Sequence, residues 1–539
     1  MIKEATLEDT YDFVIVGSGF GGSVSALRLA EKGYRVLVIE KGTWYNEVSL
    51  PGTTWKLGKW LWMPSVGLRG IMKMTHLRHA TVMSGVGVGG GSLVYGATLP
   101  TPKSAFFNSG SWSDLADWEK TLKPHYATAL KMLGARQNPT HSPADEVIKT
   151  LAENAGKPDK FEPSKVGIFF SDADREGELV DDPYFDGQGP KRRGCIQCGE
   201  CMTGCRHNAK NSLDKNYLYL AQKMGVKVLA ETEVVDISPS GSTVGDEGYF
   251  VTARTRQSAF RSVKRTLSVG AVIFSGGVVG TVPLLLKLKQ RGRLPRLSAR
   301  LGQDIRTNNE SLTGVTSLKD DKDFSRGIAI GSILSTDEHS HVEPVHYGAA
   351  SGTWRFLLGP LVTGGSLAKR FRNFLQEMVQ SPAENLNVLF RRGWGHRTIY
   401  LLFMQHLDST LSLELGRFGR IKSKLPATEG TQAPSCDIPE AIEVTRKVEE
   451  IMEGKATRSL TDLLTGAPST AHVLGGAVMG KDEHSGVVNQ FGQVFNYDNL
   501  YICDGSTVSA NPGVNPSLTI TAITEHVMSH IQSKSKKDE

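Results

Sequence analysis

At the start of the chain, the pattern of hydrophobic residues changes from that of a strand to that of a helix and back to that of a strand. A short continuous apolar run, typical of a strand buried on both faces, leads directly into a glycine-rich turn. Small and apolar residues then recur at helical spacing up to Gly33, and a second apolar run closes at Glu40. The pattern therefore predicts, in order, a strand at 12–16, a turn at 17–22, a helix at 23–32 and a strand at 34–39.

The turn has the sequence GSGFGG, which is the GxGxxG pattern of dinucleotide-binding folds. Gly17 permits the tight turn, Gly19 lets the backbone approach a pyrophosphate, and Gly22 lets the helix pack closely on the strand. The helix N-terminus then faces the phosphates, and Glu40 is placed to bind an adenosine ribose hydroxyl. The pattern does not distinguish NAD from FAD, because both contain the same adenylate half.

Composition and charge exclude several classes of protein. The 539 residues are 39% hydrophobic and 22% charged, an ordinary globular profile, and at ~150 residues per domain this length predicts two to four lobes. The formal charge of +6 is too small for this length to indicate nucleic-acid binding. The chain has no apolar run of ~18 residues, and residues 1–11 carry Glu4, Glu8 and Asp9 without the apolar core of a signal peptide. We therefore expect a soluble, cytoplasmic protein with no nucleic-acid partner.

Five further motifs lie beyond the nucleotide pattern. Glycine alternates with valine at 84–93, and an apolar segment at 272–281 leads into a predicted helix at 282–288. Nearer the C-terminus come AHVLGG at 471–476, NLYICDGS at 499–506 and GVNPSLTITA at 513–522. Together with GxGxxG, these motifs and their order resemble the glucose-methanol-choline (GMC) family of FAD-dependent alcohol oxidoreductases, and within it the cholesterol-oxidase-like bacterial members.

The resemblance implies the fold class and the division of the chain. It implies an α/β (α+β) fold in which a Rossmann-like FAD-binding lobe is interleaved with a substrate-binding lobe built on an antiparallel sheet with helices. The expected FAD-binding segments are 1–100, 195–310 and 460–535, the substrate-binding segments are 101–194 and 311–459, and 536–539 is a flexible tail.

The resemblance also implies a cofactor, FAD, held without a covalent bond. Gly90, Gly91 and Ser92 match the positions beside the flavin. Val234, in a strand-like segment at 226–237, matches the residue whose backbone meets the adenine. Three more positions, Gly276, Asp504 and Gly505, complete the expected cofactor contacts, the last two near the ribityl and pyrophosphate groups.

Oxidation of an alcohol requires a group that accepts the hydroxyl proton and a second polar group that holds the oxygen. His472 matches the family's active-site histidine, and Asn515 matches its partner asparagine. The implied activity is hydride transfer from a hydrophobic alcohol to flavin, most simply a 3-beta-hydroxysteroid such as cholesterol, with oxygen or an external acceptor taking the electrons. Steroid double-bond isomerisation also needs a carboxylate base, for which Glu343 is the first candidate and Glu310 the second.

Two positions depart from the better-known steroid oxidases. Tyr95 stands where those enzymes carry asparagine, and Ser517 stands where they carry phenylalanine. Both positions lie near the expected flavin, and both bear on isomerisation and on reactivity with oxygen.

Four of the six cysteines, Cys195, Cys198, Cys201 and Cys205, follow the spacing C-x2-C-x2-C-x3-C of bacterial ferredoxins. The fourth cysteine of that motif normally binds a different cluster, so Cys205 must bend back, or Cys436 or Cys503 must approach. Three interpretations stay open: an iron-sulfur cluster, a zinc ion, and metal-free thiols in a compact loop. The basic residues on both sides of the cluster are expected to lower the thiol pKa values, which suits either metal ligation or redox reactivity.

Aromatic and amphipathic segments raise the question of how an apolar substrate enters. Four tryptophans, Trp44, Trp55, Trp60 and Trp62, lie close together in the sequence, as in an apolar gate or in ordinary core packing. Segments 354–358 and 369–378 have the pattern of an amphipathic lid in transient, peripheral contact with a membrane surface, and equally that of a solvated helix that covers the core.

Two alternative functions remain at this stage. One is a flavin dehydrogenase of another bulky hydrophobic or cyclic alcohol that relays electrons through a cluster bound by the cysteines. The other is a non-catalytic redox flavoprotein in which the cysteines matter and His472 does not.

Overall fold

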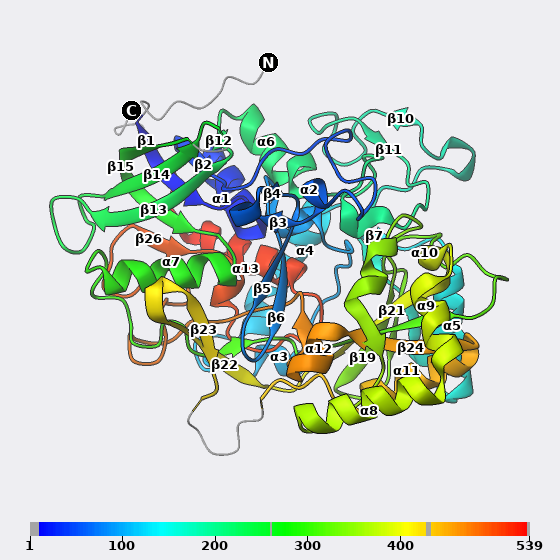
Figure 1. The fold of residues 1–539 in the computed structure, drawn as a ribbon. Coiled ribbons are helices and arrows are strands. Elements are labelled where there is room, and N and C mark those ends of the chain that lie inside the picture. The colour runs from blue at the N-terminus through cyan, green and yellow to red at the C-terminus, as the bar shows by residue number, and fades with distance from the viewer. Residues whose placement is uncertain (1–9, 259–260, 427–432, 536–539) are drawn as a thin grey trace.

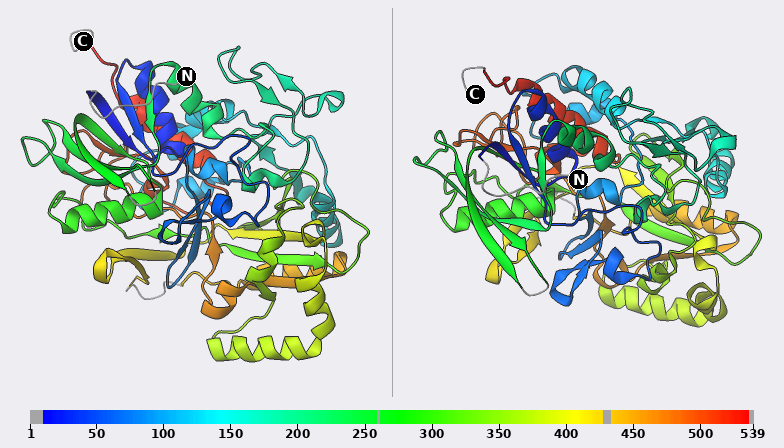
Figure 2. Two further views of the ribbon diagram at one scale, coloured as in Figure 1. Left: turned by 45° about the horizontal axis from the view of Figure 1, so that its top comes forward. Right: turned by 90° about the horizontal axis from the view of Figure 1, so that it is seen from above.

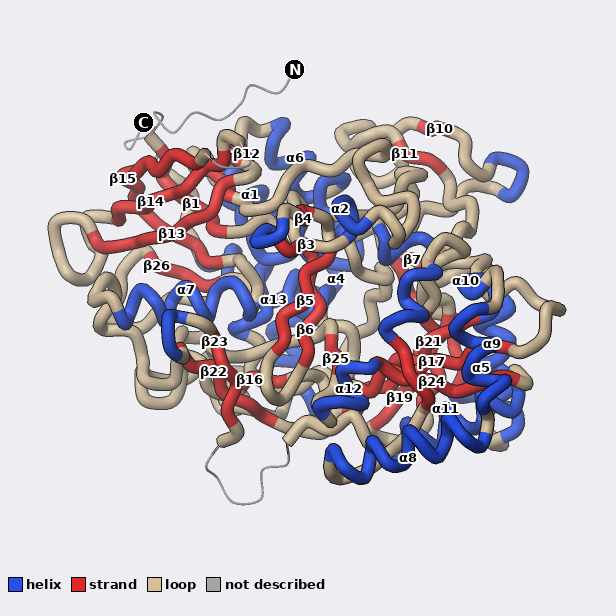
Figure 3. The backbone as a smooth tube through the Cα atoms, in the orientation of Figure 1, coloured by secondary structure: helices blue, strands red, loops and turns tan. Residues whose placement is uncertain are grey.

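The computed structural model describes residues 10–258, 261–426 and 433–535 (Figure 1). The acids Glu4, Glu8 and Asp9 and the predicted tail at 536–539 lie outside the described residues. Two seven-stranded sheets dominate the structure and occupy separate regions of the molecule (Figure 3).

The first sheet is built on the predicted nucleotide unit. Its strands lie in the order β12 (Lys227–Leu229), β2 (Val36–Ile39), β1 (Tyr11–Val16), β15 (Ser262–Phe274), β14 (Tyr249–Arg256) and β13 (Thr232–Pro239), with β26 (Leu500–Ile502) beside β15. Strand β1 pairs in parallel with β2 and with β15, so that Val14 lies opposite Leu37 on one side and Val272 on the other. All three side chains are fully buried, as the continuous apolar runs predict.

Helix α1 (Phe20–Glu31) follows the glycine turn and packs against α13 (Ser517–His530), near the other end of the described chain. Arg28 of α1 donates from Nε to Oε2 of Glu525 at 2.8 Å, and the hydroxyl of Tyr217 in α6 (Tyr217–Lys223) donates to the other carboxylate oxygen at 2.6 Å. This buried junction joins segments that lie almost 500 residues apart in the sequence.

The second sheet is antiparallel throughout. Its order is β20 (Leu358–Pro360), β24 (Gly454–Ser459), β17 (Ser311–Ser317), β21 (Thr398–Gln405), β19 (Ser340–Val345), β18 (Ser332–Ser335) and β8 (Phe161–Pro163). Helices α5 (Pro143–Asn154) and α11 (Pro439–Ile451) cover one face. Because strand side chains alternate, Leu401 and Phe403 pack under these helices, whereas Leu402 turns to the opposite face, toward the first sheet.

Smaller sheets connect the two large ones. The hairpin of β5 (Met72–His76) and β6 (Thr81–Gly85), extended by β25 (Ser469–Thr470), lies between them (Figure 1). The remaining strands are β16 (Ile305–Arg306), β22 (Thr410–Leu415) and β23 (Ile421–Lys424) in one sheet, and the pairs β3 (Trp62–Met63) with β4 (Leu68–Arg69), β7 (Arg136–Gln137) with β9 (Lys165–Val166), and β10 (Leu179–Val180) with β11 (Arg192–Arg193).

The other helices surround these sheets. They are α2 (Leu57–Trp60), α3 (Ser104–Phe107), α4 (Trp118–Met132), α7 (Val278–Gln290), α8 (Leu367–Gln380), α9 (Pro382–Phe390), α10 (Trp394–Arg397) and α12 (Leu460–Thr465). Within the described residues, every helix is too short or too polar to cross a lipid bilayer.

The structure confirms the predicted fold class, a Rossmann-like sheet combined with an antiparallel sheet and helices. One predicted element is wrong: the strand at 226–237 is broken into β12 and β13, because Glu231 takes a left-handed φ of 51° between them and the chain turns. Helix α7 begins four residues before the prediction and ends two residues after it. The lobe boundaries drawn from the sequence remain predictions.

Candidate active site

A cavity of about 1070 Å³ runs between the two large sheets and the β5–β6 hairpin. Both glycine-rich turns line it on one side, and apolar side chains of the antiparallel sheet line it on the other. Its volume is at the upper end of the range for small-molecule sites, ~300–1,000 Å³, so it has room for a long cofactor together with a substrate.

The two glycine turns meet in the wall of this cavity. Gly17 has a left-handed φ of 106°, and a Cβ added there would lie 2.4 Å from the Ser275 carbonyl oxygen. A Cβ on Gly90, whose φ is 53°, would lie 2.7 Å from the Cα of Gly19. The backbones therefore touch, and only glycine permits both the conformation and the contact. What remains is a cradle of bare backbone, which fits the pyrophosphate of a dinucleotide.

Glu40 lies at the end of β2 beside this cradle. Its carboxylate accepts hydrogen bonds from the Ser18 amide at 3.1 Å and the Ser18 hydroxyl at 2.8 Å, and from the Gly42 amide at 2.9 Å. Glu40 thus fixes the glycine turn from behind and also lines the cavity, where the fingerprint expects a ribose contact.

Lys41, Lys73 and Lys287 are among the lysines that line the cavity, a feature that the sequence patterns did not single out. Burial, together with the charges of Lys41 and Lys287, lowers the pKa of Lys73 to about 8. The charged form of Lys73 would be stabilised by an anion beside it, which is what a dinucleotide pyrophosphate supplies.

A second strand-turn-helix unit faces the first. Strand β15 leads into Gly276 and Gly277, and α7 begins one residue later. Asp504 accepts hydrogen bonds from the Gly277 amide at 2.9 Å and from the Thr281 hydroxyl, so it holds this turn against the end of β26. Burial raises the pKa of Asp504.

The opposite wall of the cavity is apolar. It is formed by side chains from the antiparallel sheet, the β5 strand and neighbouring loops, among them Met72, Leu312, Ile330, Val345, Tyr347 and Leu402. An apolar wall of this kind binds a hydrophobic molecule through the removal of its surface from water.

His472 and Glu310 lie at the junction of the polar and apolar walls. The Nδ1 atom of His472 is hydrogen-bonded to Oε1 of Glu310, and the other carboxylate oxygen accepts from the Ala471 amide at 3.1 Å. Burial alone lowers the pKa of His472, but the negative charge and hydrogen bond of Glu310, with the charge of Glu343, outweigh it and raise that pKa. With Nδ1 engaged by the carboxylate, the neutral imidazole has Nε2 as its proton acceptor.

Asn515 lines the cavity and is backed by a second carboxylate. Its Nδ2 atom donates to Oε2 of Glu343 at 3.2 Å, while its Oδ1 atom is buried and has no hydrogen-bond partner among the described residues. A buried amide oxygen without a partner is costly, so this atom is suited to accept from a bound molecule.

The structure brings together most of the residues predicted to bind cofactor or substrate. The cavity is lined by Gly17, Gly19, Glu40, Gly90, Gly91, Val234, Gly276, His472, Asp504, Gly505 and Asn515. Gly22 packs behind it, where a Cβ would lie 2.1 Å from the Gly17 carbonyl oxygen. The Ser92 hydroxyl is used inside the protein, donating to the Gly89 carbonyl at 2.7 Å. Glu343 is fully buried behind Asn515.

The pairing of Glu310 with His472 was not predicted from the sequence, which ranked Glu310 below Glu343. A local signal was present, because Glu310 directly follows two asparagines, Asn308 and Asn309, that take left-handed φ angles of 60° and 45°. Asparagine tolerates this conformation better than most residues, so an asparagine pair before a strand indicates a fixed turn.

The four clustered cysteines line a second, smaller cavity. Cys436 and Cys503 are not part of it: Cys436 packs beside Asp437 and Asp462, and the Cys503 carbonyl lies against Gly21 in the first sheet. The expectation that one of them approaches is therefore wrong, and Cys205 itself bends back, because Gly204 takes a left-handed φ of 88°.

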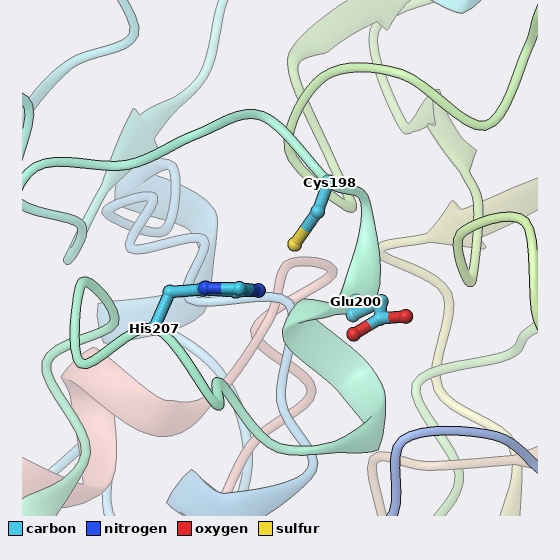
Figure 4. Close-up of side chains that lie close together, drawn as sticks. All are labelled: Cys198, Glu200 and His207. Carbon is cyan, nitrogen blue, oxygen red and sulfur yellow. The ribbon is translucent and has the colours of Figure 1, made fainter. Parts of the chain in front are cut away.

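The prediction that basic neighbours lower the thiol pKa values is also wrong. Burial raises the pKa of Cys198 to about 12 and that of Cys201 to about 11. Burial outweighs the neighbouring cations: the charge of Lys210 lowers the pKa of Cys201 but is the smaller influence, and Arg206 is paired with Glu200 at 2.6 Å. One nitrogen of His207, one oxygen of Glu200 and the sulfur of Cys198 lie within 4.8 Å of one another at the cavity rim (Figure 4).

Comparisons with known proteins agree with this site. Residues 15–57 match the model of an NAD(P)-binding Rossmann-like domain, and residues 432–524 match the GMC oxidoreductase model. The chain is 41% identical to a cholesterol oxidase of Acinetobacter baumannii, over 98% of this chain and 96% of that protein. It is also 41% identical to a cholesterol oxidase of Mycobacterium tuberculosis, over 99% of this chain and 93% of that protein.

A solved structure supports the fold at lower sequence similarity. Pyridoxine 4-oxidase from Mesorbium loti superposes with a TM-score of 0.60 at 14% identity, over 96% of this chain and 99% of that one. The near-complete match to relatives of 41% identity, with the nucleotide cradle and the matching C-terminal family model, settles the family. The chain belongs to the GMC oxidoreductase family and is an FAD-dependent alcohol oxidoreductase of its cholesterol-oxidase-like group.

Proposed function

We propose that the protein oxidises the secondary hydroxyl of a sterol, a 3-beta-hydroxysteroid such as cholesterol, to a ketone. The observation that carries this proposal is the apolar wall of the cavity that also contains His472 and Asn515, because a hydrophobic surface with a few polar groups suits an apolar molecule that bears a hydroxyl. The relatives at 41% identity are named cholesterol oxidases, which supports the same class of substrate.

FAD, when bound against the glycine cradle, supplies the acceptor for the hydride of the alcohol carbon. The chain's own residues provide the rest. His472 accepts the hydroxyl proton at Nε2, directly or through a water, and Asn515 holds the substrate oxygen or the flavin edge through its side-chain amide.

Two carboxylates act as positioning residues behind these groups. Glu310 holds His472 through Nδ1 and stabilises the imidazolium that forms when the proton arrives. Glu343 accepts a hydrogen bond from Nδ2 of Asn515 and so fixes the orientation of the Asn515 amide. The same contact fixes the position of Oδ1, which has no partner among the described residues. Each polar residue of the site thus has one carboxylate that fixes its orientation.

For double-bond isomerisation the geometry favours Glu310 over Glu343. A base must reach the substrate, and Glu310 borders the cavity whereas Glu343 is enclosed behind Asn515. If the ketone is isomerised in this site, we expect Glu310 to move the proton.

The proposed source of the sterol is a lipid surface in transient contact with α8. Leu367, Phe371, Leu375 and Val379, spaced by four residues on this helix, are 54%, 51%, 49% and 80% exposed. Helix α8 lies at the edge of the molecule (Figure 2), and it also carries Lys369, which is exposed. A helix with an apolar stripe and cationic neighbours is suited to an anionic membrane surface.

The proposed activity is tested by anaerobic mixing of the purified holoenzyme with cholesterol and, separately, with a simple cyclic alcohol. Bleaching of the flavin band by cholesterol, at a rate well above that with the cyclic alcohol, is the expected result. If only the cyclic alcohol bleaches the flavin, the enzyme carries out the same oxidation on a different class of alcohol. Absence of bleaching by every alcohol would leave a non-catalytic redox flavoprotein.

A further inference from the structure

The small cavity lined by four cysteines lies beside the flavin cavity. Lys210, which lines the small cavity, donates from Nζ to the carbonyls of Cys201 at 2.6 Å and Leu93 at 2.9 Å. Met202 and Tyr95 line the large cavity and also pack against the apolar cluster that contains Cys195 and Cys201. Met202 and Tyr95 therefore form part of the boundary between the thiols and the cofactor site.

Two of the four sulfur atoms accept hydrogen bonds from backbone N–H groups. The Gln197 amide donates to Sγ of Cys195 at 3.4 Å, and the Ala209 amide donates to Sγ of Cys205 at 3.4 Å. The Glu200 and Ala329 amides act in the same direction on the other two thiols, since they lower the pKa of Cys198 and of Cys201 respectively. A neutral thiol is a weak acceptor and needs no such donors, whereas a metal-bound thiolate is stabilised by them.

Buried positive charge surrounds the same sulfurs. Lys210 is only 2% exposed, and the acceptors of its three hydrogen bonds are all backbone carbonyls. Arg192, 1% exposed, donates to the Asn208 and Ala209 carbonyls and to an asparagine oxygen. Asp214, a carboxylate whose charge acts on both cations, is paired with Lys215 at 2.8 Å. Neither Lys210 nor Arg192 has a hydrogen bond to a carboxylate among the described residues, and two such buried cations imply an anion at this place.

The spacing of the sulfurs argues against a single ion held by the cysteines. Four thiolates around one zinc at ~2.3 Å would lie about 3.8 Å apart. Within the described chain, the group of ligand atoms that gathers within 4.8 Å contains a single cysteine, Cys198, with Glu200 and His207. Glu200 is already paired with Arg206, and a zinc ion there would leave Cys195, Cys201 and Cys205 without a metal, although backbone amides donate to Cys195 and Cys205.

We propose that Cys195, Cys198, Cys201 and Cys205 hold an iron-sulfur cluster of the [4Fe-4S] class, placed between the flavin cavity and the protein surface. The left-handed turn at Gly204 brings the fourth cysteine to the same cavity, in place of the proline-linked arrangement of ferredoxins, where it binds another cluster. The cluster with four thiolates carries net negative charge, which Lys210 and Arg192 balance.

Because the cluster site lies beside the flavin cavity, its role is to carry electrons away from the reduced cofactor. This role rests on the proposed alcohol oxidation. Each alcohol that becomes a ketone releases two electrons and two protons. The cluster takes the electrons from the reduced cofactor one at a time and passes each to an external one-electron carrier, a protein that meets the half-buried side at Cys198 and Cys205. Two carriers are reduced per alcohol, the cluster returns to its oxidised state, and both protons leave to water.

The cluster is tested by its composition in holoenzyme purified without oxygen and reconstituted with iron and sulfide. We expect about four iron and four sulfide ions per chain, with a broad absorbance near 400 nm in addition to the flavin bands. Cys201→Ser will lower bound iron at least about fourfold, while Cys436→Ser, which changes a buried thiol outside the cavity, will not. Should Cys201→Ser fail to fold, as judged by lost FAD, Cys198→Ser, at the half-buried rim, provides the same comparison.

Two results would overturn the cluster. One is fewer than about two irons per chain after reconstitution, and the other is one zinc per chain that His207→Ala removes. The relay has its own readout. In the Cys198→Ser variant, flavin bleaching by alcohol will stay within about twofold of the unmodified enzyme, and reduction of cytochrome c will fall at least about tenfold. If alcohol does not bleach the flavin of the unmodified enzyme, the proposed function is contradicted, but the iron measurement still tests the cluster.

Discussion

His472 and Glu310 form a buried imidazole-carboxylate pair whose partners lie 162 positions apart in the sequence. Because the carboxylate raises the pKa of the imidazole while burial lowers it, the pair determines the pH at which His472 is free to accept a proton. A base acts only when unprotonated, so flavin reduction by alcohol must weaken as the pH falls below this raised pKa.

Replacing Glu310 with glutamine removes the charge but keeps a side chain of similar shape. We expect the acid limb of the pH profile for kcat/KM to move to lower pH, because burial then acts on His472 with less opposition. The maximal rate will also fall, since the imidazolium loses its counter-charge. Stopped-flow flavin reduction between pH 5 and 9 measures both effects. If the acid limb does not move, Glu310 does not influence the group whose protonation causes that limb.

Replacing His472 with alanine tests the proton acceptor itself. The rate of flavin reduction by alcohol is expected to fall by ~10²–10⁴, the usual contribution of a positioned acid-base group, while FAD content stays unchanged. His484, which is 86% exposed at its side chain, gives the control His484→Ala with the rate of the unmodified enzyme. Turnover of His472→Ala within about threefold of that rate would falsify the assignment.

Isomerisation distinguishes the two carboxylates. Supplied directly with the non-conjugated ketone of cholesterol, Glu310→Gln is expected to convert it at least about tenfold more slowly, because that carboxylate borders the cavity. Glu343→Gln keeps the conversion, since Glu343 is enclosed. The conjugated ketone is followed by its ultraviolet absorbance. The opposite pattern would return the role of base to Glu343.

Gly90→Ala tests the cradle. The new Cβ would lie 2.7 Å from the Cα of Gly19, so the two turns must separate, and we expect FAD binding to weaken at least about tenfold. Gly225 is the matched control: it also has a left-handed φ, 95°, but a Cβ there meets no atom within 4 Å. Gly225→Ala shares the backbone strain of ~1 kcal/mol and retains FAD. Equal FAD content in both variants would show that the contact is unimportant.

The stripe on α8 predicts how the protein meets a lipid surface. Phe371→Glu places a charge in the stripe, and co-sedimentation with anionic vesicles that contain cholesterol should fall about tenfold or more, since burial of one aromatic side chain is worth ~1.5–3 kcal/mol. Gln376→Glu adds the same charge to the same helix outside the stripe and serves as the control. Turnover of detergent-solubilised cholesterol is expected to be equal in both. Equal vesicle binding would contradict the lipid contact.

Local sequence patterns predicted the nucleotide unit well, because its determinants are near neighbours. The apolar run before Gly17, the helical spacing after it and the acid at Glu40 are all read within thirty positions, and the structure has them as β1, α1 and the end of β2. The break between β12 and β13 was missed because it depends on one backbone angle, at Glu231, in a segment whose composition favours a strand.

Long-range contacts were harder to predict. His472 and Asn515 were identified through the family resemblance, but no pattern could pair them with Glu310 and Glu343 across more than 150 residues. The cysteine spacing left a cluster, a zinc ion and metal-free thiols open, and the buried Lys210 and the amide donors to Cys195 and Cys205 became visible only when the loops were folded together.

The buried contact between Arg28 and Glu525 has a consequence for how the enzyme is made. These residues are 497 positions apart, and the helices that carry them flank the same nucleotide turn, which α13 supports from the far end of the chain. During synthesis the first strand, turn and helix leave the ribosome long before their final partners exist. The nucleotide unit can therefore reach its final packing only after α13 has been synthesised.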